Sequence, residues 1–194
     1  MNTKSLVNTR RMALCALMAA VFCVLAPISI PIGPISITGG TLAIYLTAYL
    51  LGGVWGAAAT LVYLLLGFAG LPVFSNYMGG AARLAGPTGG YLVGYLPMVL
   101  LAGLVIQWPA HRFDGMGRAG IALTLAVQLA GMAAATAVLY AFGTAWYCVQ
   151  AGVGLQTALA ACVIPFIPCD LIKMAAALAV GMPVRNRLEQ AGLL

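Results

Sequence analysis

Long apolar runs alternate with shorter polar or glycine- and proline-rich segments along the chain. The runs lie near residues 12–26, 41–51, 54–68, 90–108, 119–146 and 165–183. Each run is too long and too continuous for the alternating strands of a membrane β-barrel, so the pattern predicts helices. The second and third runs are short for a full crossing, which needs about 20 apolar residues. We interpret them as a pair joined by a tight break at Gly52-Gly53.

Two segments between the runs have compositions that exclude a long helix. Residues 27–40 hold three prolines and three glycines and alternate Ile with Ser and Pro, which predicts an extended or hairpin-like loop. Residues 70–90 are rich in glycine, and loops longer than about 12–15 residues are usually functional or disordered. Because this loop is too apolar for disorder, we expect both segments to be lids over a ligand. The alternative for 70–90 is a surface loop held at lipid headgroups by Tyr77 and Arg83.

The composition makes the chain an integral membrane protein. Of its 194 residues, 63% are hydrophobic and 6% are charged, whereas a soluble domain carries about 25% charged residues. We expect one all-α membrane domain over residues 1–194, with six transmembrane helices and no soluble domain. Five cysteines without a CxxC pair and a single His111 suggest neither a metal site nor a cofactor.

The basic residues predict the orientation. Six crossings place both termini on one side, and seven of the nine Lys and Arg residues fall on that side: Lys4, Arg10, Arg11, Arg112, Arg118, Arg185 and Arg187. The positive-inside rule makes that side cytoplasmic and explains the net charge of +6 without nucleic acid. The first run follows Arg10-Arg11 and could be a signal peptide. Since it lacks a convincing cleavage site, we expect an uncleaved span.

Two groups of residues inside the apolar runs suggest contacts. Ala16 and Ala20 have the small-xxx-small spacing that lets another helix approach closely, either within the bundle or from a partner. Gln128 could reach a ligand or hydrogen-bond to a neighbouring helix.

Asp170 and Lys173 are the strongest candidates for a binding site. Asp170 is one of three acidic residues in the chain and has apolar sequence on both sides. Pro168 fits the first turn of a helix, so Asp170 would lie near its N-terminus, with Lys173 one turn deeper on the same face. A purely structural ion pair is the alternative, but such pairs often add little stability. We expect a small, mostly apolar acid with N–H groups as the ligand, with Asn76 and Arg83 contributing from the lid.

Three motifs in the sequence resemble the BioY family, the biotin-binding S-components of energy-coupling factor (ECF) transporters. They are Gly70-Leu71-Pro72-Val73-Phe74; Gly86-Pro87-Thr88-Gly89-Gly90-Tyr91-Leu92 with Gly94-Tyr95; and Pro165-Phe166-x-Pro168-x-Asp170-Leu171-x-Lys173. The resemblance covers nearly the whole chain. It implies a six-helix S-component in a bacterial cytoplasmic membrane that takes up biotin.

The resemblance also implies site residues and partners. Asp170 and Lys173 match the family's last motif, and Asn76 corresponds to an asparagine of its lid loop, whereas no motif anchors Arg83. An alanine-rich first helix, with Ala16 and Ala20, would dock on a transmembrane T-component that works with two ABC-type ATPases. Some members are thought to act without a dedicated module, and such a solitary protein could be a homo-oligomer.

Two other functions remain open at this stage. The chain could be an S-component for another vitamin, or an intramembrane enzyme that uses Asp170 as a base. The sequence shows no second catalytic carboxylate, Ser/His pair or metal ligands that would favour the enzyme. It also has no phosphate-binding lysine motif, so any ATP hydrolysis would belong to partner subunits.

Overall fold

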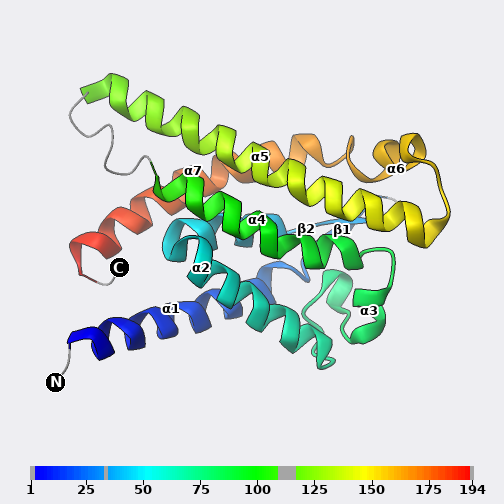
Figure 1. Ribbon diagram of the computed structural model, residues 1–194, viewed down its shortest axis with the longest axis horizontal. Coiled ribbons are helices and arrows are strands. Elements are labelled where there is room, and N and C mark those ends of the chain that lie inside the picture. Colours follow the sequence, from blue (N-terminus) through cyan, green and yellow to red (C-terminus); the bar gives the residue numbers. More distant parts are fainter. Residues whose placement is uncertain (1–2, 33–34, 109–116, 193–194) are drawn as a thin grey trace.

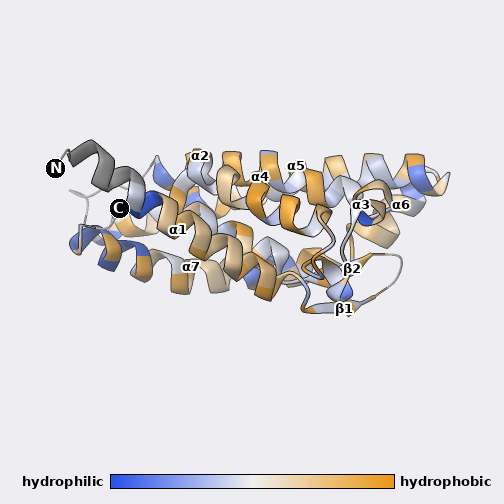
Figure 2. Cartoon of the chain, turned by 90° about the horizontal axis from the view of Figure 1, so that it is seen from below, coloured by the Kyte–Doolittle hydropathy of each residue, from blue (hydrophilic) through white to orange (hydrophobic). Residues whose placement is uncertain are grey.

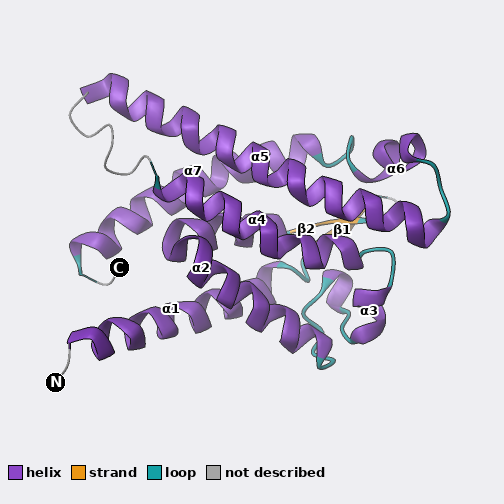
Figure 3. Ribbon diagram, in the orientation of Figure 1, coloured by secondary structure: helices purple, strands orange, loops and turns teal. Residues whose placement is uncertain are grey.

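The computed structural model describes residues 3–32, 35–108 and 117–192, with side chains from residue 9 onward. Its elements, in chain order, are α1 (Thr3–Leu25), β1 (Ser29–Pro31), β2 (Ser36–Thr38), α2 (Gly40–Phe68), the 3-10 turn η1 (Ser75–Tyr77), α3 (Ala81–Ala85), α4 (Gly89–Gln107), α5 (Gly117–Ala151), α6 (Leu155–Cys162) and α7 (Ile167–Gln190). The described residues are therefore helical apart from one short hairpin and the loops (Figure 3). Most of the predicted polar loop, including His111, Arg112 and Asp114, lies outside them.

α2 folds back on itself at Gly52. The backbone there has φ 74° and ψ −164°, a conformation that is essentially restricted to glycine. The Thr47 methyl group lies 3.3 Å from the position that a Cβ at residue 56 would take. Nine residues of straight helix would separate these positions by about 13.5 Å, so residues 40–51 and 53–68 pack side by side (Figure 1). The break that the sequence predicted at this point is present.

The β1–β2 hairpin follows the Ile/Ser alternation of the sequence. Ser29 pairs with Thr38, Ile30 with Ile37 and Pro31 with Ser36 in an antiparallel register. Pro31 lies at the end of its strand, where a missing N–H does least harm to the ladder.

Three helices extend beyond their apolar runs. α1 begins at Thr3 rather than near residue 12, α5 continues to Ala151, and α7 continues through Pro183 to Gln190. Hydropathy marks only the part of a helix that suits lipid, and a polar sequence can continue the same helix beyond it. Pro183 therefore does not end α7, although the sequence prediction placed the helix end there.

α2 lies at the centre of the bundle. It packs against α1, α4 and α7, and α4 packs in turn against α5. The largest fully buried side chains are aromatic and include Phe22, Tyr45, Tyr49, Tyr63 and Phe74. Within the described chain, α2, α4, α5 and α7 are long and apolar enough to cross a membrane.

A ladder of side-chain hydrogen bonds joins α2 to α5. The Tyr45 hydroxyl bonds to Thr136 Oγ1 at 2.5 Å, and the Tyr49 hydroxyl donates to Gln128 Oε1 at 2.8 Å. Gln128 Nε2 also donates to the Ile106 carbonyl at 3.3 Å. Gln128 thus joins neighbouring helices, the second of the two roles that the sequence allowed.

The bundle has two unlike ends. Both termini lie at one end, where hydrophilic residues gather on the last turns of α7 and near the start of α1 (Figures 1 and 2). The other end, called the lid end here, holds the β1–β2 hairpin, residues 70–90, α6 and the first turn of α7.

Candidate functional site

Asp170 is fixed in the first turn of α7 at the lid end. Pro168 occupies an early helical position, where its lack of an N–H costs nothing. The Asp170 N–H donates to the Phe166 carbonyl at 2.9 Å, which continues the turn. Only 3% of Asp170 is exposed, and the positive end of the helix dipole favours its carboxylate.

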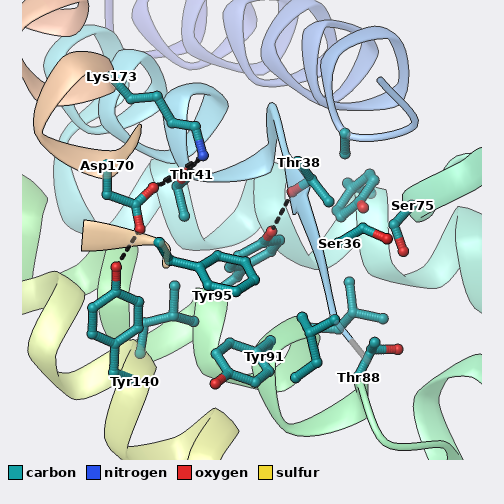
Figure 4. Close-up of a pocket in the computed structure, with 16 residues that line it drawn as sticks. Ser36, Thr38, Thr41, Ser75, Thr88, Tyr91, Tyr95, Tyr140, Asp170 and Lys173 are labelled. Atoms are coloured by element: carbon teal, nitrogen blue, oxygen red, sulfur yellow. Dashed lines mark hydrogen bonds and ion pairs between the residues drawn. The ribbon is translucent and has the colours of Figure 1, made fainter. Parts of the chain in front are cut away.

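The Asp170 carboxylate accepts hydrogen bonds from three helices. Thr41 Oγ1 of α2 donates to Oδ1 at 2.9 Å, and Lys173 Nζ donates to the same oxygen at 3.0 Å. The Tyr140 hydroxyl of α5 donates to Oδ2 at 2.6 Å. A buried charge is costly unless it is paired and hydrogen-bonded, and here both conditions are met (Figure 4).

Lys173 lies one helical turn after Asp170, as the sequence predicted. Its Nζ also donates to Thr41 Oγ1 at 2.9 Å, and 15% of its side chain remains exposed. An ammonium group has three donors. The described contacts use two of them, which leaves one N–H for a ligand.

Asp170 and Lys173 both line a pocket at the lid end. Its wall also contains apolar side chains (Ala26, Ile35, Leu92, Leu139 and Phe166) and hydroxyl-bearing ones (Ser36, Thr38, Thr41, Tyr63, Ser75, Thr88, Tyr91, Tyr95 and Tyr140). Figure 4 shows Asp170, Lys173 and Tyr140 on one side, and Ser36, Thr38 and Ser75 on the other. A pocket with polar groups on two sides and apolar side chains in its wall suits an elongated amphiphile with a polar group at each end.

The pocket is narrow in this structure. Its free volume is about 50 Å³, well below the roughly 300–1,000 Å³ of pockets that enclose small-molecule ligands. A vitamin-sized ligand therefore requires the walls to separate. The hairpin and residues 70–90 supply Ser36, Thr38 and Ser75 to the wall, and their displacement would widen the pocket.

Asn76 joins the two lid segments and does not line this pocket. Its Oδ1 accepts from Ser29 Oγ at 2.8 Å, its backbone N–H donates to the same Oγ at 2.9 Å, and its Nδ2 donates to Ser36 Oγ at 3.1 Å. Asn76 adopts the left-handed conformation, with φ 58°, which asparagine tolerates better than most residues. In this structure the described hydrogen bonds of Asp170 and Lys173 to other elements come from Thr41 and Tyr140.

Arg83 lies on α3, away from the described wall of the pocket. Its Nε is buried without a hydrogen-bond partner among the described residues. The structure does not bring Arg83 together with Asp170.

Thr41 and Tyr140 were not predicted from the sequence as site residues. Hydroxyl side chains are common in membrane helices, so neither residue stood out as a charged residue does. One signal was available for Tyr140, which follows Thr136 by four residues on α5 and so lies on the same face of the helix.

Ala16 and Ala20 face outward from the bundle. Both are exposed, as are Ala13 and Leu17, whereas Met18 and Phe22 on the opposite face of α1 are buried. These alanines therefore do not serve the internal packing of the described chain and remain available to a partner or to lipid.

The described residues contain no group of three or more His, Cys, Asp or Glu side chains that could hold a metal ion. All five cysteines are free. Burial raises the pKa of the Cys162 thiol in α6 to about 11, so this thiol stays protonated and unreactive near neutral pH.

The chain is similar to known proteins over most of its length. The family model described as the BioY family matches residues 1–190. The chain is 37% identical to the biotin transporter BioY of Rhizobium etli over 180 residues, covering 91% of this chain and 94% of the relative. It is 33% identical to the biotin transporter BioY of Thermotoga maritima over 178 residues, covering 91% and 96%.

A solved structure shares the fold. It is the crystal structure of the S-component for biotin from an ECF-type ABC transporter, which matches with a TM-score of 0.79 at 26% identity. The match covers 96% of this chain and 95% of the other.

Proposed function

We propose, from the premise that this chain belongs to the BioY family, that it binds biotin and mediates its uptake as the substrate-binding component of an ECF-type transporter. The Rhizobium etli and Thermotoga maritima relatives each match 91% of this chain, and both are named as biotin transporters rather than as enzymes. We therefore assign it no catalytic role. Biotin is the transported ligand in this proposal, and no cofactor or nucleic acid takes part.

The observation that carries the proposal is the placement of Asp170 and Lys173. They form a buried ion pair at 3.0 Å in the wall of a mostly apolar pocket. Such pairs often add little net stability, so a ligand is the better reason for their position. The Asp170 carboxylate can accept from the ureido N–H groups of biotin, and the Lys173 ammonium can donate to its ureido oxygen or its carboxylate.

The lid segments, residues 27–40 and 70–90, control access in this proposal. Asn76 holds them together through Ser29 and Ser36. Arg83 has a buried Nε without a described partner and could supply a cation when the lid moves. Asn76 and Arg83 thus belong to the proposed binding machinery as lid residues, and neither lines the described wall of the pocket.

We further propose a single membrane domain that crosses the bacterial cytoplasmic membrane six times. The six crossings are α1, the two halves of α2, α4, α5 and α7. Both termini lie at one end of the bundle (Figure 1), and the basic residues of the sequence favour the cytoplasm for that end. The pocket would then open to the outside, where the vitamin is captured.

The proposed partners are a transmembrane T-component and two ABC-type ATPases. The exposed Ala16 and Ala20 supply a surface of small side chains on which a partner helix can pack closely. A homo-oligomer is the alternative if the protein acts without such a module.

Ligand binding by the purified protein tests the proposed function. Calorimetry should give submicromolar affinity for biotin and far weaker binding of thiamine, riboflavin and lipoate. Micromolar or weaker binding without a preference for biotin would overturn the proposal. Preference for another vitamin would favour an S-component of different specificity, and chemical conversion of the ligand would favour the enzyme.

A further inference from the structure

Tyr63 lines the pocket, and its hydroxyl group has no hydrogen-bond partner among the described residues. The residue is fully buried, at 0% exposure, and its hydroxyl oxygen makes no hydrogen bond to any described residue. Most buried polar side-chain atoms in proteins are hydrogen-bonded, so an exception calls for an explanation. Leaving such a group unpaired costs free energy.

The other tyrosines of the pocket and core set a contrast. The hydroxyls of Tyr45, Tyr49, Tyr91, Tyr95 and Tyr140 each hydrogen-bond to a protein group. Two further orphaned atoms, Thr47 Oγ1 and Arg83 Nε, belong to residues outside the described pocket wall. Among the described residues, Tyr63 is thus the one that combines the pocket wall with a buried, unpaired hydroxyl.

Neighbouring rings hold Tyr63 in place. Phe22 of α1 stacks on it, with ring centroids 5.0 Å apart and planes at 23°. Phe74 of the lid loop meets it edge-on at 5.6 Å and 82°. Phe74 itself packs against Gly67, where a Cβ would lie 2.1 Å from the ring. The Tyr63 ring is therefore held in place in this structure, and its hydroxyl has a defined position.

We infer that the Tyr63 hydroxyl hydrogen-bonds to the bound ligand and is a specificity-determining residue of the pocket. The inference rests on the proposed function, because it identifies the ligand as biotin. A phenol can both donate and accept, so it suits a ureido or carboxylate group. A ligand without a polar atom at this point would leave the hydroxyl unpaired and would bind less tightly.

The test is Tyr63→Phe, which removes one oxygen and keeps the ring contacts with Phe22 and Phe74. Biotin affinity of the purified protein is measured by calorimetry, and the melting temperature is measured without biotin. We expect affinity to fall roughly two- to tenfold, the effect of one neutral hydrogen bond. The melting temperature should stay the same or rise, because the substitution removes an unpaired buried group.

Tyr49→Phe is the matched control, because Tyr49 bonds to Gln128 and lies outside this pocket. It should lower the melting temperature and leave biotin affinity unchanged. If Tyr63→Phe leaves biotin affinity unchanged, the inference is wrong but the proposed function stands. The same holds if biotin affinity falls and the melting temperature also falls as it does in Tyr49→Phe. If the parent protein binds no biotin, both the inference and the proposed function fail.

Discussion

The ion pair of Asp170 and Lys173 makes a prediction at the scale of single residues. Asp170→Asn keeps the shape of the side chain but removes its charge, and Lys173→Ala removes the ammonium. Because each variant removes a charge-assisted hydrogen bond to the ligand, we expect each to weaken biotin binding by roughly 10- to 100-fold. Calorimetry of the purified variants measures the change, and circular dichroism checks that they remain folded.

A double variant separates binding from stability. Each single substitution leaves a buried partner unpaired, which lowers stability. Asp170→Asn combined with Lys173→Gln is neutral and should recover much of the lost melting temperature without recovering affinity. Recovery of biotin affinity in the double variant would show that the pair is only structural. Glu189→Gln is the control for losing an ion pair outside the site, because it breaks the pair with Arg185 at the other end of α7.

Asn76 distinguishes a connection between the lid segments from a direct ligand contact. If Asn76 acts by holding the hairpin, Asn76→Ala and Ser29→Ala remove the same hydrogen bond and should speed biotin dissociation alike. We expect an increase of roughly two- to tenfold in each. Stopped-flow release of a fluorescent biotin derivative measures the rate. Faster dissociation in Asn76→Ala, with no change in either Ser29→Ala or Ser36→Ala, would instead indicate a direct contact between Asn76 and biotin.

Charged residues of the site could be predicted from the sequence, but neutral ones could not. Asp170 and Lys173 stood out because an ionisable side chain in an apolar run is costly. Thr41 and Tyr140 are as close to the carboxylate, yet a hydroxyl in a membrane helix costs little and has many explanations. The orphaned hydroxyl of Tyr63 depends on what surrounds it, which only the folded chain reveals.

At the scale of elements, the fold-back of α2 depends on Gly52. Its φ of 74° disfavours any side chain, and a Cβ would lie 2.1 Å from Gln107 Nε2. Gly52→Ala should therefore reduce the stability of the folded protein by more than about 2 kcal/mol. Gly154 is the control, since it has φ −70° and open space around it. Thermal unfolding in detergent should show a large loss for Gly52→Ala and little change for Gly154→Ala.

Turns were easier to predict than helix ends. Gly52-Gly53 and the Pro-rich 27–40 segment are local signals, because glycine and proline act on their own backbone. The ends of α1 and α7 are not local, since a helix can continue in polar sequence beyond the membrane. The hydrogen bond between Tyr45 and Thr136, 91 residues away, depends on how the helices assemble. It cannot be predicted from the sequence around either residue.

The exposed face of α1 yields a prediction for the whole molecule. Ala16→Trp and Ala20→Trp place a bulky ring on a surface that we propose is covered by a partner helix, so they should block assembly. Neither position lines the pocket, so biotin binding by the purified component should be retained. Uptake by cells that express the energising module, and co-purification of its subunits, should both fall at least tenfold. Ala134→Trp is the control, because Ala134 is an exposed alanine on α5.

This split between binding and uptake distinguishes a docking surface from a surface that meets lipid. A tryptophan that faces lipid is tolerated on α1 as readily as on α5, so equal uptake in all three variants would contradict docking through Ala16 and Ala20. Loss of binding together with uptake would indicate damage to the bundle itself, through the contact between Phe22 on the buried side of α1 and Tyr63 of α2. If only the two α1 variants lose uptake, and both still bind biotin, a partner must cover this face of α1.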